Sequence, residues 1–165
     1  MRRILLAGVL FAAIGQGAVS TLDQETLKGY LENGAPFDFI LIDIRTVAEV
    51  TAAIGNAACK PYNLVWPDQF KEQCVKIPKD QAIILYCRSG GRATNAAEYL
   101  NAAGYTRVFN AGGFSTWNGP TVPPSEIKPA SLLPEPSMRA KAKAARGPSL
   151  PSEDSLSRML LPPGF

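Results

Sequence analysis

The residues with the clearest chemical potential lie in the stretch ILYCRSGGRA, where a cysteine ends an apolar run. Cys87 is the candidate nucleophile, and the thiolate is the reactive form of a cysteine. Gly90 and Gly91 let the backbone curl so that successive N–H groups face inward and bind an anion. Two arginines and the start of the following helix add positive charge. The loop therefore favours a thiolate and an anionic ligand. The candidate binding residues are Arg88, Ser89, Gly90, Gly91 and Arg92.

The length of this loop distinguishes between two kinds of anion. A covalent persulfide on Cys87 would carry its negative charge on the terminal sulfur, and the backbone N–H groups would stabilise it. A phosphate ester would also suit such groups, but cysteine phosphatases place five residues between the cysteine and a guanidinium that grips the phosphate. Only four residues separate Cys87 from Arg92. The tighter loop favours the sulfur anion.

Histidine is absent from the 165 residues, and its absence excludes several mechanisms. A Ser-His-Asp triad, a Cys-His pair and histidine metal ligands are ruled out. We therefore expect the loop itself to activate the Cys87 thiol. No Cys-x-x-Cys motif occurs, so neither a thioredoxin motif nor a zinc site is predicted.

The net charge of +3 comes from the ends of the chain rather than from its middle. Residues 21–118 contain nine Lys and Arg against ten Asp and Glu. A near-neutral region without a basic stripe or interleaved aromatic residues argues against a nucleic-acid partner.

Strands alternating with helices must position the cysteine loop. The apolar runs FDFILIDIR, ending near Asp43, and QAIILYC predict buried strands, with ACKPYNL as a weak candidate and RVFN as a final short strand. Helices are predicted from a Thr21 cap to Asn33-Gly34, from Pro67 to about Val75, and from the loop to Gly104. Capping residues Thr46 and Glu49 predict a short helix to about Ala53, and AGGFSTWNG a turn with another. This order indicates an α/β fold with a mostly parallel sheet, and Cys87 at the carboxyl end of its central strand, where such sheets place ligands.

Three stretches resemble the single-domain rhodanese family of sulfurtransferases. LIDIRTVAEV has the family's Asp-x-Arg followed by a glutamate, CRSGGRA resembles its active-site loop, and AGGFSTW resembles its closing Gly-Gly-x-x-x-Trp motif. Together they span about residues 22–118. The matching residues are Asp43, Arg45 and Glu49, then Cys87, then Gly112, Gly113 and Trp117.

This resemblance implies a three-layer fold with a central, mostly parallel sheet flanked by helices. It implies that Cys87 carries a persulfide and moves sulfane sulfur from a donor such as thiosulfate to a thiol or cyanide. Asp43 and Arg45 would support the loops at the pocket rim, and no metal or organic cofactor is implied. The chain departs from the family at Ala52-Ala53-Ile54, where Gly-His-Ile is usual, and at Ala93, where a hydroxyl residue is common.

Residues 1–20 have the order of a secretory signal peptide: two arginines, an apolar run and then small residues. Cleavage is expected after Ser20, or otherwise after Ala18. The apolar run is shorter than the roughly 20 residues that span a bilayer, which argues against a membrane anchor. We therefore expect a periplasmic or secreted protein without a membrane span after signal removal.

Residues 119–165 are predicted to be a disordered or loosely attached tail, because they hold ten of the 14 prolines. The stretch SEDSLSRMLLPPGF could form one helical turn that docks on a partner, or remain an unstructured end. The domain boundaries predicted from sequence are thus 1–20, 21–118 and 119–165.

The three cysteines of an exported protein leave one thiol unpaired. Cys59 and Cys74 could form a disulfide, which would leave Cys87 as the free reactive thiol; two buried free cysteines are the alternative.

A sulfurtransferase acting on a small sulfur anion and a thiol acceptor is the function that these features predict. A rival is a non-catalytic rhodanese-like binding module of the cell envelope, with the tail contacting a protein partner. A weaker alternative is a relative of phosphatases or arsenate reductases.

Overall fold

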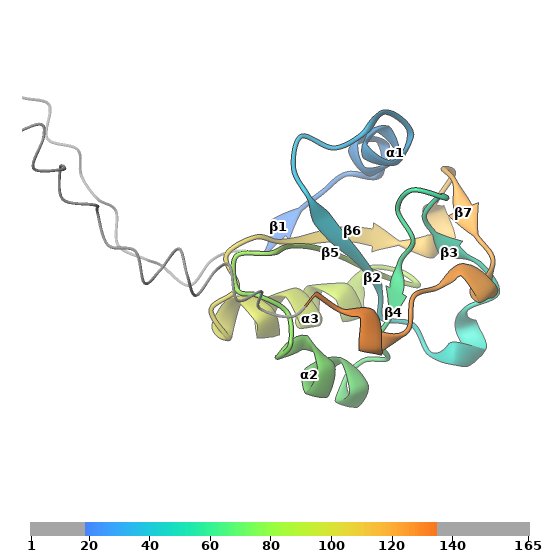
Figure 1. Ribbon diagram of the computed structural model, residues 1–165. Coiled ribbons are helices and arrows are strands. Elements are labelled where there is room, and N and C mark those ends of the chain that lie inside the picture. Colours follow the sequence, from blue (N-terminus) through green and yellow to red (C-terminus); the bar gives the residue numbers. More distant parts are fainter. Residues whose placement is uncertain (1–18, 135–165) are drawn as a thin grey trace, which may run out of the picture.

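A five-stranded, entirely parallel sheet forms the centre of the computed structural model, which describes residues 19–134 (Figure 1). The strand order is β1-β6-β5-β2-β4, so the chain crosses over between most neighbouring strands. These connections produce the layered α/β arrangement expected from alternating strands and helices. The strands are β1 Ser20–Thr21, β2 Phe39–Asp43, β4 Tyr62–Asn63, β5 Ala82–Cys87 and β6 Val108–Gly113.

Strand β5 occupies the middle of the sheet and ends at the cysteine of the loop. All six of its residues are buried. It pairs with β2 from Phe39↔Ala82 to Asp43↔Tyr86, and with β6 on its other side. A strand covered on both faces must be apolar throughout, which explains the uninterrupted sequence AIILYC.

Helices cover both faces of the sheet (Figure 1). Helix α1, Gln24–Asn33, lies on one face, and α2, Asp68–Cys74, and α3, Gly91–Ala102, lie on the other. Each face has its own apolar core, one around Leu27 and Ile84 beneath α1 and one around Phe70 and Leu100 beneath α2 and α3. The predicted three-layer α/β fold is confirmed.

Two predicted helix boundaries need correction. Asp23, not Thr21, caps α1, because its Oδ1 accepts the Thr26 N–H at 2.8 Å while Thr21 lies in β1. The predicted Thr46–Glu49 capping box is confirmed, but it begins a single 3₁₀ turn, Val47–Glu49. The helix cannot continue, because β3, Ala53–Ile54, pairs with β7, Thr121–Val122.

The segment 120–134 packs against the domain, so the predicted start of a loose tail at residue 119 is wrong. Beyond β7, the Lys128 N–H donates to the Pro61 carbonyl at 2.8 Å, and the Tyr62 hydroxyl donates to the Leu132 carbonyl at 2.8 Å. Leu133 is buried in the core beneath α2 and α3. The apolar residues of this segment are too scattered to form a core of their own, but Val122 and Leu133 are buried against the domain, while Leu132 stays exposed.

Residues 1–18 and 135–165 lie outside the described part of the chain, and with them most of the predicted signal peptide and the rest of the predicted tail. Between residues 19 and 134, no helix has the length and hydrophobicity needed to cross a membrane.

Candidate active site

Cys87 lies buried at the carboxyl end of β5, where the chain turns directly into α3. The Gly90 N–H donates a hydrogen bond to Cys87 Sγ at 3.1 Å. Gly90 adopts a φ of 99°, in the left-handed region that favours glycine. The predicted curl of the loop toward the sulfur is therefore present, and Gly90 is the residue that creates it.

Asn110 of β6 holds this loop from the neighbouring strand. Its Nδ2 donates to the Gly90 carbonyl at 3.3 Å and to Thr94 Oγ1 at 2.9 Å, and its Oδ1 accepts the Gly112 N–H at 2.8 Å. The side chain is nearly fully buried. Sequence reasoning missed Asn110, although a polar residue ending the strand RVFN was a usable signal.

Thr94 supplies the hydroxyl that Ala93 lacks. Its Oγ1 lies 3.3 Å from the Gly90 carbonyl, to which it donates a hydrogen bond. Ala93 is itself fully buried beneath the helix, in the core. The loop therefore receives a hydroxyl hydrogen bond from Thr94 although position 93 is alanine.

The closing Gly-Gly motif makes room for the cysteine loop. A Cβ atom on Gly113 would lie 2.6 Å from the Arg88 carbonyl oxygen, which is closer than such atoms approach. The Ser115 N–H donates to the same carbonyl at 3.0 Å. Only glycine at position 113 thus lets the end of β6 pack against the loop.

Arg92 forms a two-pronged ion pair with Glu49, at 2.8 Å from Nη1 to Oε2 and 2.6 Å from Nη2 to Oε1. The hydrogen bonds from Arg92 hold the pKa of the Glu49 carboxyl well below its usual range. The Glu49 carboxylate and, to a smaller extent, Cys87 raise the pKa of Arg92. Sequence reasoning placed Arg92 in the loop and Glu49 in a separate motif, and the structure joins them at the base of α3.

A cavity of about 320 Å³ opens beside the loop. Arg88 lines it with an exposed side chain that has no hydrogen bond or ion pair within residues 19–134. Ser89 is also exposed on the loop. Arg88 is therefore the loop cation that is available to an anionic ligand. The remaining lining residues are Arg45, Glu49, Thr51, Phe114 and Ser115, of which Thr51, Phe114 and Ser115 were not predicted.

Asp43 and Arg45 form a buried ion pair behind this cavity. Arg45 Nη2 donates to Asp43 Oδ2 at 2.6 Å and to the Ala52 carbonyl at 2.6 Å, and its Nη1 donates to the Glu49 carbonyl at 3.3 Å. Burial alone would lower the pKa of Arg45, but the hydrogen bonds and charge of Asp43 outweigh it and raise the pKa. The guanidinium also lies 4.0 Å from the Phe114 ring centroid. Both residues thus support the rim of the cavity.

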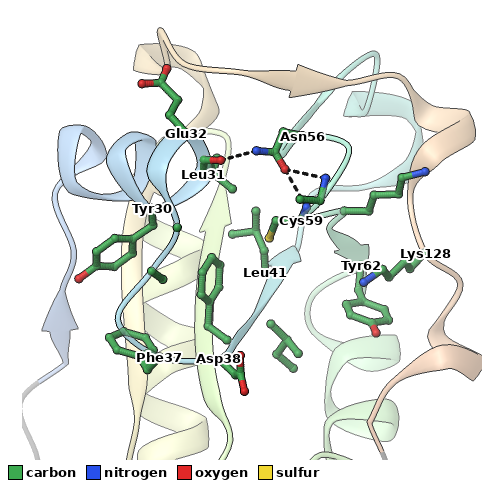
Figure 2. Close-up of a pocket in the computed structure, with 16 residues that line it drawn as sticks. Tyr30, Leu31, Glu32, Phe37, Asp38, Leu41, Asn56, Cys59, Tyr62 and Lys128 are labelled. Carbon is green, nitrogen blue, oxygen red and sulfur yellow. Dashed lines mark hydrogen bonds between the residues drawn. The ribbon is translucent and has the colours of Figure 1, made fainter.

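The three cysteines are free thiols, so the suggested Cys59–Cys74 disulfide is wrong. Cys59 packs on the α1 face of the sheet, whereas Cys74 belongs to the core on the opposite face. The central sheet separates the two sulfur atoms. Cys59 lines a second cavity (Figure 2), which shares no lining residue with the cavity beside the cysteine loop.

Fold and site together define an α/β domain with a glycine-rich cysteine loop at the carboxyl edge of a parallel sheet. Residues 23–119 match the family described as the Rhodanese-like domain, and the chain belongs to that family. A sulfurtransferase of Allochromatium vinosum is 40% identical over 101 residues, which cover 60% of this chain and 88% of the relative. The chain is therefore a member of a sulfurtransferase family, as its motifs predicted.

Two further proteins are similar to the chain. The mitochondrial protein HIGH ARSENIC CONTENT 1 of Arabidopsis thaliana is 32% identical, over 60% of this chain and 62% of the relative, so the chain spans less than two thirds of that protein. The crystal structure of a rhodanese-like domain protein from Staphylococcus aureus superposes with a TM-score of 0.50 at 25% identity, covering 67% of this chain and 99% of that one.

Proposed function

We propose that the protein transfers sulfane sulfur through a persulfide on Cys87. The hydrogen bond from the Gly90 N–H to Cys87 Sγ carries this proposal, because it directs a backbone donor at the atom on which the chemistry would occur. The left-handed φ of Gly90 and its contacts with Asn110 and Thr94 hold that donor in place before substrate arrives.

In the first half-reaction, the Cys87 thiolate attacks the outer sulfur of a donor such as thiosulfate. The new bond joins Cys87 Sγ to that sulfur, the donor's S–S bond breaks, and its electron pair leaves with sulfite. The products are a Cys87 persulfide anion and SO₃²⁻, so charge is conserved without an external oxidant. In the second half-reaction, cyanide or an acceptor thiolate attacks the terminal sulfur and releases the Cys87 thiolate, which gives ping-pong kinetics.

The two loop arginines have different parts in this proposal. Arg88 lines the cavity without a partner in the described chain and attracts the sulfonate end of the donor. Arg92 positions the start of α3 through Glu49. The phosphatase alternative has less support, because the arginine that would grip a tetrahedral phosphate has both terminal nitrogens bonded to Glu49.

The mass of the intact protein after incubation with thiosulfate tests the proposal. We expect a gain of one sulfur atom that is lost on adding cyanide, with thiocyanate released. Cys87→Ser should abolish both, whereas Cys59→Ser, which removes the thiol of the other cavity, should leave them unchanged. Absence of the adduct and of thiocyanate in the folded, unmodified protein would refute the enzymatic function and favour the non-catalytic binding module.

Export belongs to the same proposal and rests on the signal-like residues 1–20. Ser20 of β1 pairs with Phe109 of β6, and Val19 packs against the core. Cleavage after Ala18 would therefore keep β1 whole, whereas cleavage after Ser20 would remove the first of its two residues. Mass spectrometry of the amino terminus in the periplasmic fraction distinguishes the two sites, and an uncleaved cytosolic chain would refute export.

A further inference from the structure

A second cavity, of about 420 Å³, lies beside the amino-terminal half of β2, whereas the cysteine loop follows the carboxyl end of β5. It lies between the second half of α1, the first half of β2 and the loop that carries Cys59. Asn56 fixes that loop, because its Nδ2 donates to the Leu31 carbonyl and its Oδ1 accepts the Cys59 N–H at 2.7 Å. Hydrogen bonds from Asn56 therefore fix the wall of the cavity that carries Cys59. Cys87 is not among the lining residues, so the cavity is separate from the proposed sulfur chemistry.

One wall of this cavity is an open strand edge. Strand β4 pairs only with Ile42 and Asp43 of β2, so Phe39, Ile40 and Leu41 have a partner strand on the β5 side alone within residues 19–134. Successive residues of a strand direct their backbone groups to alternate sides. Phe39 and Leu41 share the direction of Asp43, whose carbonyl accepts the Leu64 N–H from the β4 side. Their backbone groups thus face the cavity, and such edges pair with extended chain.

The lining of the cavity is largely apolar and carries charged groups of both signs. Tyr30, Phe37 and Leu41 form apolar walls. The charged lining residues are Lys60, Lys128, Glu32 and Asp38. Lys60 pairs with Glu126 at 3.1 Å on the surface, whereas Lys128 has no carboxylate partner in the described chain.

We propose that residues 155–161 of the same chain, SLSRMLL, bind this cavity as an added strand along Phe39–Leu41. The position of the chain supports this occupant. The Tyr62 hydroxyl donates to the Leu132 carbonyl, and Tyr62 lines the cavity, so the described chain ends near the β4 edge of the sheet, to which the cavity also belongs. The amino-terminal residues instead enter the domain at β1, on the opposite edge of the sheet.

The composition of residues 135–165 selects this segment. Their densest apolar run is Met159-Leu160-Leu161, and the acidic pair Glu153-Asp154 that precedes it is complementary in charge to Lys128. Pro162 and Pro163 end the segment, since proline cannot continue a strand ladder, and the open edge accepts only a short strand. The residues between 135 and 152 reach tens of ångströms at about 3.3 Å each, and tethering gives an effective concentration on the order of millimolar.

Alkylation of Cys59 tests the proposal, because a bound segment would cover that thiol. In the Cys87→Ser background, removal of residues 151–165 should speed alkylation about tenfold, as expected when a tethered segment is bound roughly 90% of the time. A synthetic peptide of residues 152–165 should restore the slow rate and slow the amide exchange of Leu41. Leu150→Asp, which replaces an apolar residue outside the segment by an acidic one, is the control and should have no effect.

Charge reversal provides a second test that leaves the chain length unchanged. Lys128→Glu should speed alkylation in the full chain, and Asp154→Lys added to it should restore the slow rate. Equal alkylation rates with and without residues 151–165 would overturn the proposal. Protection that disappears on dilution would also overturn it, because the segment would then come from a second copy of the chain.

Discussion

Replacement of Asn110 by alanine tests how the loop is held against β6. The substitution removes the two hydrogen bonds from Nδ2 to Gly90 and Thr94 and the one that Oδ1 accepts from Gly112. A buried polar group left without its partner costs about 1–3 kcal/mol, so we expect the free energy of unfolding to fall by about 2–4 kcal/mol. Urea unfolding followed by circular dichroism measures this loss.

The same substitution should slow the formation of the persulfide. Gly90 would keep the hydrogen bonds that its carbonyl accepts from the Thr94 N–H and hydroxyl, so the loop would loosen without being lost. A weakened hydrogen bond to a charged sulfur is worth about 1.5 kcal/mol, which is about tenfold in rate. Sulfite release in a single turnover with excess protein measures the chemical step directly.

Thr94→Val is the matched control, because it removes the hydroxyl from the same cluster and leaves the Asn110–Gly90 contact intact. We expect it to lower the rate less than Asn110→Ala does. An Asn110→Ala protein that is destabilised but retains its single-turnover rate within about twofold, well short of the tenfold expected from that hydrogen bond, would refute a positioning role. Unchanged stability would refute the energetic reasoning itself.

Three further substitutions have expected outcomes. Glu49→Gln should lower the unfolding free energy by up to about 1 kcal/mol at neutral pH, since it removes the partly exposed pair with Arg92. The folded-state pKa of Glu49 is depressed, so the stability from this pair is present above pH 4.5, the ordinary pKa of the group, and is lost as pH falls toward the folded-state pKa. Below pH 4.5 the unmodified protein should therefore lose more stability than Glu49→Gln in urea titrations. Parallel losses in the two proteins would contradict the pairing. Asp43→Ala leaves a buried guanidinium unpaired and should cost about 3–5 kcal/mol in thermal or urea unfolding, whereas a cost under about 1 kcal/mol would show that the pair is dispensable. Gly90→Ala should slow sulfite release and destabilise the fold by about 1–2 kcal/mol, because Gly90 has a left-handed φ of 99°. Gly91→Ala lies at a helical position with open space and should be neutral or stabilising. Equal effects of the two substitutions would contradict the role of the left-handed turn.

Sequence patterns predicted the parts of the fold that depend on local burial. The run QAIILYC predicts β5 because a strand covered on both faces must be apolar at every position. The spacing of Ala93, Ala96, Ala97 and Leu100 predicts α3 because all four face the same core. The curled cysteine loop could be predicted in the same way, because the strand, the glycines and the helix that define it are consecutive in the sequence.

Features that depend on contacts distant in sequence could not be predicted in this way. The partner of Arg92 is 43 residues away in the chain, and only the packing of the Val47–Glu49 turn beside α3 reveals it. The count of cysteines allowed a Cys59–Cys74 bridge, but the side of the sheet on which each lies is a property of the topology. The proline-rich composition after residue 119 predicted a loose tail instead of β7 and the buried Leu133, because the residues that pair with β7 and pack on Leu133 lie elsewhere in the domain.

Because the sequence has no histidine, the proposed chemistry depends on these long-range contacts. With no imidazole to accept a proton, a nucleophilic Cys87 depends on how backbone donors are placed around its sulfur. The donor that contacts Sγ belongs to Gly90, and β6 holds this residue through Asn110, with Thr94 of α3 bonded to both. The sequence CRSGGRA would therefore not create the same environment on a different scaffold, because the geometry of its central donor is determined by a strand more than fifteen residues away.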